Sequence, residues 1–118
     1  MSAINISFCC HLAFIFPELL SLLEEHLKDN TGEILPHLLM YDYCQLVSND
    51  LGNRPWHKEL LHTLEKIYSE TDDDISNLIA VSFIESIHFT NDLDNKYTSL
   101  LGPKLLKHYN LVFKGYKT

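Results

Sequence analysis

A chain of 118 residues is long enough to enclose one hydrophobic core and too short to hold a two-domain cofactor enzyme. Hydrophobic residues make up 46% and charged residues 21% of it, which excludes a disordered tail, a collagen and a low-complexity linker. Sixteen acidic and nine basic residues give a net charge of −7, which argues against a nucleic-acid-binding protein.

The first thirty residues predict two helices. Between residues 3 and 14, hydrophobic residues recur at the three- and four-residue spacing of one helical face. They are Ile4, Phe8 and Leu12, with Ile15 just beyond. Pro17 suits the first turn of a second helix, because its missing N–H would have no partner there. The predicted inward face of this second helix is Leu19, Leu20, Leu23 and Leu27, and residues 30–32 end it.

Two further helices are predicted in the middle of the chain. Pro36 opens the third, which ends near Leu51, and the fourth begins at Trp56, after the turn at residues 53–55. Residues 18–24 and 59–65 share the pattern Glu-Leu-Leu-x-x-Leu-Glu at a separation of 41 residues. A period of this length is typical of stacked helical hairpins.

Residues 72–88 predict a helix with apolar side chains all around it, and such a helix is usually buried by neighbours on several sides. Thr71 followed by Asp74 resembles a capping box at its start. Ser82 is expected to bond to its own backbone. Glu85 is expected to need a partner such as Arg54 or a histidine.

The C-terminal part predicts a polar connection at residues 92–95, a helical turn near residues 97–101 and a last helix from Pro103. Residues 111–118 are expected to form a flexible basic tail. The predicted fold is all-α, with one compact domain over residues 1–118. It has about six helices, arranged as stacked helical hairpins around the buried central helix at residues 72–88.

The charge is unevenly distributed along the chain. Residues 1–66 carry a net charge of −5, residues 67–95 carry −7 without a Lys or Arg, and residues 96–118 carry +5 without an acid. The acidic middle block would attract basic partners and repel phosphates, or serve solubility alone. The basic end, with its interleaved aromatic residues, could contact RNA or DNA. A solvated last helix near the acidic block explains it more simply, so no nucleic-acid partner is predicted.

Three cysteines are an odd number in a chain that can build a core without disulfides, which indicates a reducing compartment. Residues 4–23 lack the basic start and the cleavage site of a signal peptide. His11, Pro17 and Glu18 interrupt them too often for a bilayer span. We therefore expect a cytoplasmic protein with no membrane partner.

No catalytic or phosphate-binding signature occurs in the sequence. His57 and His62 would point in different directions from one helix, and the cysteines with His11 suit a buried core better than a zinc site. Adjacent carboxylates lie at solvated helix ends, where tuned pKa values are not expected. We predict no enzymatic activity, no cofactor and no metal.

The apolar string at residues 78–85, Leu-Ile-Ala-Val-Ser-Phe-Ile-Glu, is accompanied by Phe-Pro-Glu-Leu at 16–19, Ile-Leu-Pro-His-Leu at 34–38 and Leu-Leu-Gly-Pro at 100–103. Together these strings resemble a family of small, acidic, all-helical bacterial proteins. Some members are similar to immunity proteins of contact-dependent growth inhibition (CDI) systems. The resemblance covers most of the chain, and it implies a cytosolic inhibitor of a delivered toxin domain.

An acidic inhibitor would suit a nuclease toxin, because its basic cleft holds phosphates and opposite charges speed association. The hypothesis is an immunity protein that neutralises its cognate toxin domain, a nuclease, by blocking the active site. The alternative is a helical adaptor or scaffold that binds another protein with no toxin involved. The predicted partner-binding residues are five aspartates and three aromatic anchors, each of which could instead face the core: Asp72, Asp73, Asp74, Asp92, Asp94, Tyr41, Trp56 and Tyr97.

Overall fold

The computed structural model describes residues 3–51, 53–69, 73–87 and 98–114, and these residues form helices and connections with no strand among them. The elements, in chain order, are α1 (Ala3–Ile15), η1 (Pro17–Leu19), α2 (Leu20–Asp29), α3 (Pro36–Ser48), α4 (Pro55–Ile67), α5 (Asp74–Leu78), η2 (Ile79–Ile84), α7 (Pro103–Tyr109) and η4 (Asn110–Lys114). The radius of gyration is 13.8 Å, close to the value of about 13.5 Å expected for one globular domain of this length. The predicted all-α single domain is confirmed.

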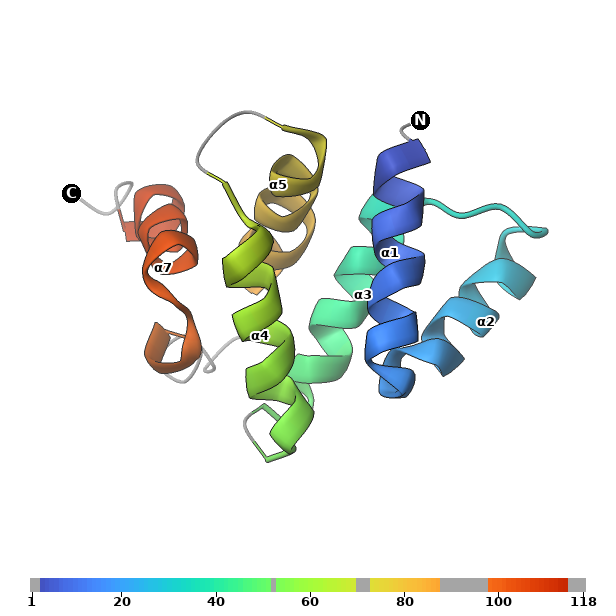
Figure 1. The fold of residues 1–118 in the computed structure, drawn as a ribbon, viewed down its shortest axis with the longest axis horizontal. Helices are drawn as coiled ribbons and strands as arrows, with labels where there is room; N and C mark the ends of the chain where they lie inside the picture. The colour runs from blue at the N-terminus through green and yellow to red at the C-terminus, as the bar shows by residue number, and fades with distance from the viewer. Residues whose placement is uncertain (1–2, 52, 70–72, 88–97, 115–118) are drawn as a thin grey trace.

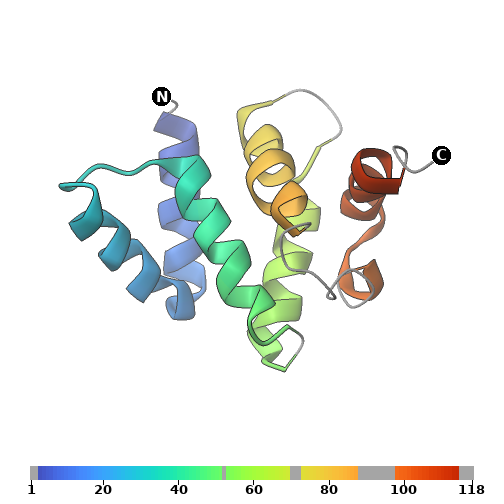
Figure 2. The ribbon, with the colours of Figure 1, turned by 180° about the vertical axis from the view of Figure 1, so that it is seen from behind.

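The helices are arranged along one long axis (Figure 1). α2 lies at one end of the molecule and α7 at the other, and both views place the remaining helices between them (Figures 1 and 2). Within this row α1, α2 and α3 contact one another, and α4 contacts α7.

The centre of the molecule is one helical rod made of α5, η2 and a 3₁₀ turn at residues 85–87. It packs against α1, α3 and α7. Five of its large apolar side chains are fully buried: Leu78, Ile79, Phe83, Ile84 and Ile87. The predicted central helix is therefore present. One strip of it faces outward, where Val81 is 44% exposed.

The rod begins at Asp74 and not at residue 72 as predicted. Asp73 is the N-cap, because its Oδ1 accepts a hydrogen bond from the backbone N–H of Ser76 at 2.8 Å. Thr71, the predicted capping residue, lies outside the described residues. An aspartate cap satisfies the same free N–H groups that a threonine would.

Two polar predictions for the rod had different outcomes. The Ser82 hydroxyl is hydrogen-bonded to Nδ1 of His37 on α3, so the predicted bond to its own backbone is wrong. The Glu85 carboxylate pairs with Nε2 of His108 at 3.1 Å, which confirms the predicted histidine partner. Arg54 pairs instead with Asp50, at 3.0 Å.

The N-terminal helices end where predicted, but their buried faces differ. The chain turns after α2 with positive φ angles at Thr31 (51°) and Gly32 (83°). Of the four residues predicted to share one face of the first helix, Phe8 and Leu12 are buried, whereas Ile4 and Ile15 are 56% and 43% exposed. Leu20, predicted to face inward on the second helix, is 46% exposed. Cys9 and Ala13 complete the side of α1 that contacts the core.

The C-terminal prediction is partly wrong. Residues 98–100 form the expected helical turn, and α7 begins at Pro103 as predicted. Residues 111–114 continue as the helical segment η4, so they are not part of a flexible tail. The predicted polar connection at residues 92–95 and the tail residues 115–118 lie outside the described part of the chain.

Glu65 of α4 holds α7 in place. Its two carboxylate oxygens accept hydrogen bonds from the backbone N–H groups of Lys104 and Leu105, both at 3.0 Å. A carboxylate at a helix N-terminus satisfies free N–H groups and opposes the positive end of the helix dipole. Gly102 makes this approach possible, since a Cβ there would lie 2.5 Å from Cγ of Glu65. Lys104 also donates from Nζ to the Tyr68 carbonyl at 2.6 Å.

Glu65→Ala should therefore lower the free energy of unfolding by about 1–2 kcal/mol, through the loss of two charge-assisted hydrogen bonds. Gly102→Ala should lower the free energy of unfolding by a similar amount in the wild-type chain. It should lower it much less in the Glu65→Ala background, because the new Cβ then has no Glu65 side chain to clash with. Chemical denaturation of the four chains in this double-mutant cycle measures the coupling. Equal costs for Gly102→Ala in both backgrounds would contradict the assigned contact.

Candidate functional site

The four predicted partner-binding residues that the structure describes lie on three different helices. The other four, Asp72, Asp92, Asp94 and Tyr97, lie outside the described residues. Asp73 and Asp74 lie exposed at the start of α5, and Asp73 is engaged as the helix cap.

The two described aromatic candidates lie on other helices. Trp56 is half-buried in the first turn of α4, 4.5 Å from His57 and 6.4 Å from Phe16 between ring centroids, so it mainly packs against its neighbours. Tyr41 is 36% exposed on α3. In Figure 1 the start of α5 lies on the side of the C-terminal end of α4, whereas Trp56 belongs to the first turn of α4 at the other end. Trp56 and Asp73 are therefore not brought together.

A surface groove between α2 and α3 brings together residues that the sequence interpretation did not select. Its volume is about 450 Å³. Three kinds of side chain line it: carboxylates, aliphatic groups, and amides with one histidine. They are Glu25, Asp29 and Asp42; Leu22, Leu38 and Leu46; and Asn30, Gln45, Asn49 and His26. No Lys or Arg is among these lining residues.

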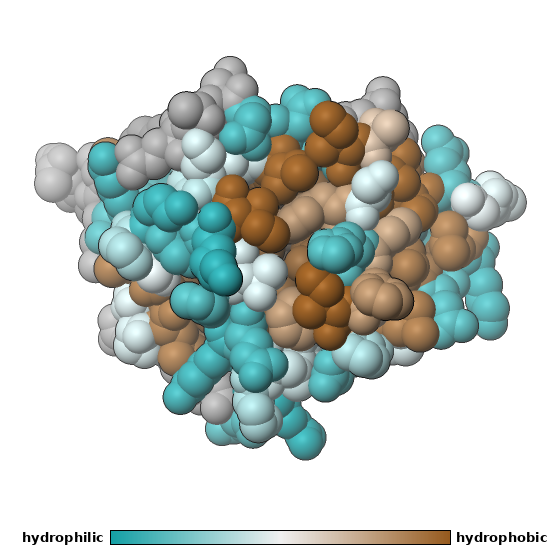
Figure 3. Space-filling model, in the orientation of Figure 1, coloured by the Kyte–Doolittle hydropathy of each residue, from teal (hydrophilic) through white to brown (hydrophobic). Residues whose placement is uncertain are grey.

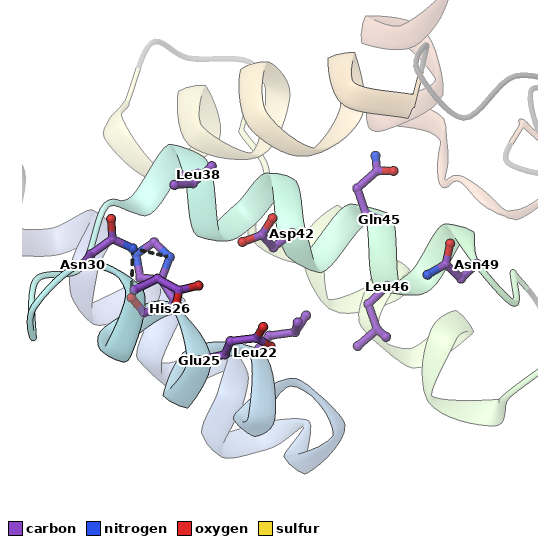
Figure 4. A pocket seen from close by; sticks show the side chains of 10 residues that line it. Leu22, Glu25, His26, Asn30, Leu38, Asp42, Gln45, Leu46 and Asn49 are labelled. Carbon is purple, nitrogen blue, oxygen red and sulfur yellow. Dashed lines mark hydrogen bonds between the residues drawn. The ribbon is translucent and has the colours of Figure 1, made fainter.

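The groove arises from the spacing of residues on two neighbouring helices. On α2, residues 22, 25, 26 and 29 share one face, and on α3 residues 38, 42, 45, 46 and 49 share another. Figure 4 shows Asp42 and Leu46 extending from α3 towards α2, where Leu22 and Glu25 lie. The i, i+4 spacing of Glu25 and Asp29 was visible in the sequence, but the pairing of the two faces was not.

His26 closes one end of the groove. It is 4% exposed, although the inward face predicted for α2 consisted of leucines alone. Its Nε2 accepts a hydrogen bond from the backbone N–H of Leu35 at 2.9 Å. The side-chain amide of Asn30 donates to the His26 carbonyl at 2.8 Å. The bond between His26 and the Leu35 N–H ties the segment before α3 to α2.

Asp42 is the carboxylate most affected by its surroundings. Its partial burial raises the pKa of this carboxyl, and the nearby Glu25 and Asp29 act in the same direction while His26 opposes them. The charged form of Asp42 is therefore less favourable here than in water. A cation that entered the groove would remove this penalty, since an opposite charge stabilises the carboxylate.

The buried thiol and phenol elsewhere in the core are poor candidates for chemistry. Burial raises the pKa of the Cys9 thiol to about 12, with Cys10 adding to the effect. Burial likewise raises the pKa of Tyr43 well above its usual value, and its hydroxyl donates to the Cys9 carbonyl at 3.1 Å. Such groups are not nucleophiles near neutral pH.

The described residues contain no group of three or more His, Cys, Asp or Glu placed to hold a metal ion. None of their helices is by itself long and apolar enough to cross a membrane. α1 and the following helical segment to Asp29 meet the length and composition criteria only as a pair bent by 115°.

Residues 9–115 match the model of the family DUF7674, a domain of unknown function. The chain belongs to this family. No curated protein and no solved structure matched the chain significantly. The groove between α2 and α3 lies entirely within the matched residues.

Asp42→Asn should stabilise the domain at neutral pH. Because the folded-state pKa of Asp42 is raised above its ordinary value of 3.8, the unfolded chain releases this proton first as pH rises. The stability that protonated Asp42 contributes is thus present below pH 3.8 and lost as pH rises through the raised pKa. Thermal unfolding of Asp42→Asn should give a Tm about 1–2 °C above wild type at pH 7, a small gain because solvent partly screens the groove.

The gap in Tm should close as the pH falls to 3.5, where both chains carry a neutral group at this position. Glu24→Gln, an exposed position on α2 outside the groove, is the control and should change Tm at neither pH. A Tm for Asp42→Asn below wild type at pH 7 would contradict the electrostatic assignment.

Proposed function

We propose that this domain is a non-catalytic protein inhibitor that captures a basic segment of its partner in the groove between α2 and α3. The observation that carries the proposal is the convergence of Glu25, Asp29 and Asp42 around an open, partly aliphatic groove. The net charge of −7 supports it, because a negative field steers basic proteins towards the domain.

The lining matches the chemistry of an arginine or lysine side chain. These side chains have an apolar stem and a charged end, which prefer aliphatic and carboxylate surroundings respectively. Leu22, Leu38 and Leu46 supply the first, and the carboxylates the second. Arginine fits best, since its planar guanidinium can bond to carboxylates and amides at once.

The most specific version of the proposal is a cytosolic immunity protein whose partner is a CDI toxin domain, a nuclease. Its support is the resemblance of the sequence to a family of small acidic helical proteins, some members of which are similar to CDI immunity proteins. A nuclease cleft holds phosphates with Lys and Arg, and the same side chains would suit this groove. Blocking the cleft requires no chemistry from the inhibitor.

A helical adaptor is the alternative, and the size of the groove is compatible with it. A volume of about 450 Å³ admits a few side chains, which suits a short basic segment as well as it suits part of a folded toxin. An adaptor would bind such a segment and leave the activity of the partner unchanged.

The binding chemistry can be tested without the partner. A titration of the ¹⁵N-labelled domain with N-acetyl-arginine methylamide should move amide signals of residues 22–49 first, with millimolar affinity. Asp42→Asn should weaken this binding at least threefold, whereas Glu24→Gln should leave it unchanged. Shifts spread evenly over all helices, or confined to α5, would contradict a site at the groove.

A test of the inhibitor function uses the candidate toxin, the product of the gene next to the one that encodes this chain. The purified domain should abolish the toxin's activity at equal concentrations. The triple variant Glu25→Gln, Asp29→Asn and Asp42→Asn should associate at least tenfold more slowly, with the difference shrinking as salt is added.

The matched control is Glu24→Gln, Glu33→Gln and Glu59→Gln, which removes the same charge from exposed positions outside the groove. It should inhibit almost as well as wild type. Binding without inhibition would favour the adaptor. An equal loss of association rate in both triple variants would contradict a specific role for the groove, because the overall negative charge alone would then explain the association.

A further inference from the structure

α1 presents an apolar stripe to the outside, although it is the first helix of an acidic chain. The helix contains no Asp, Glu, Lys or Arg. Its outward stripe consists of Ile4, Ser7, His11, Phe14 and Ile15, all of them exposed. Phe14 is 84% and Ile4 56% exposed. Figure 3 shows that hydrophobic residues cover much of this face.

The same stripe contains both a projecting group and a hollow. Phe14 projects near the C-terminal end of α1. Near the N-terminal end lies an open, mainly apolar hollow of about 520 Å³, lined by Ala3, Ile4, Ser7, Phe8, His11 and Ile75. A knob and a hollow at opposite ends of one helix are what a two-fold contact between identical surfaces requires.

We propose that two copies of this chain associate through α1, with the two helices antiparallel and Phe14 of each copy seated in the hollow of the other. The antiparallel pairing that places Ser7 opposite His11 of the second copy also places Ile4 opposite Phe14, with Ile15 beside Ile4. A small side chain then faces a large one at the crossing, and Phe14 reaches the hollow around Ala3 and Ile4. The pairing is the same in both directions, as an isologous dimer demands.

Charge permits a second copy to approach at α1, and it disfavours charged occupants there. Two chains of net charge −7 repel each other, so they can meet closely only where neither presents a carboxylate, and α1 is such a surface. A charged partner would find no counter-charge on this helix. An anionic membrane would attract neither α1, which lacks basic residues, nor the acidic chain as a whole.

The area predicts a weak dimer. The contact is confined to one face of a single 13-residue helix and the hollow beside it, so it lies at or below the lower limit of the roughly 600–1,000 Å² per partner that specific complexes bury. We therefore expect weak association. The groove stays open in this dimer, because none of its lining residues belongs to α1, which lies in front of α3 in Figure 1 and behind it in Figure 2.

Sedimentation equilibrium between 5 and 500 µM tests the proposal. Wild type should form a dimer that strengthens with added NaCl, because salt screens the repulsion between the acidic chains. Phe14→Glu should weaken the dimer at least tenfold while keeping the Tm. Leu111→Glu is the matched control, since Leu111 is 65% exposed on η4, and it should leave dimerisation nearly unchanged. A monomer at every concentration and salt, or equal weakening by both variants, would overturn the proposal.

The orientation is tested by disulfide trapping in a Cys10→Ser background. An equimolar mixture of Ile4→Cys and Ile15→Cys chains should give a disulfide-linked heterodimer, and each chain alone should stay unlinked. Linked homodimers of either variant with no heterodimer would overturn the antiparallel arrangement. The outcome is independent of the groove, whose variants should dimerise like wild type.

Discussion

The burial of one apolar helical rod is the constraint on which the rest of this fold depends. Residues 78–87 contain five large side chains with no exposed surface, and each buried side chain of this kind contributes about 1.5–3 kcal/mol. Their sum is of the order of the whole stability of a small domain. The rod must therefore be covered on several sides, and α1, α3 and α7 provide that cover. Elements from both ends of the chain are drawn to the middle for this reason.

Apolar burial has little directionality, so polar contacts determine how the covering helices are oriented. Glu65 holds the first turn of α7, and the Glu85–His108 pair connects the same helix to the end of the rod. On the other side, the contact between His37 and Ser82 joins α3 to the middle of the rod. Each of these contacts links segments far apart in the sequence.

Much of the fold could be predicted from local patterns, and the candidate site could not. Pro17, Pro36 and Pro103 marked helix starts because proline suits the first turn whatever lies around it. The apolar circumference of residues 78–87 likewise indicated a central position. Ile4 and Ile15 were misassigned because α1 has apolar residues on both sides, so its periodicity does not say which side meets the core. The groove depends on which faces of α2 and α3 meet, and this pairing is a tertiary property without a local signal.

The α1 stripe and the groove between α2 and α3 differ in charge, and electrostatics suits them to different contacts. α1 carries no charge, so it offers two like-charged chains a contact at which no carboxylate is buried. The groove holds three carboxylates close together, and Asp42 stays there although its surroundings disfavour its charge. Added salt should act oppositely on the two proposed contacts, since it screens repulsion between copies and weakens attraction to a basic partner. The proposed dimer and the proposed capture of a cationic segment are compatible in one domain, because the two contacts use no residue in common.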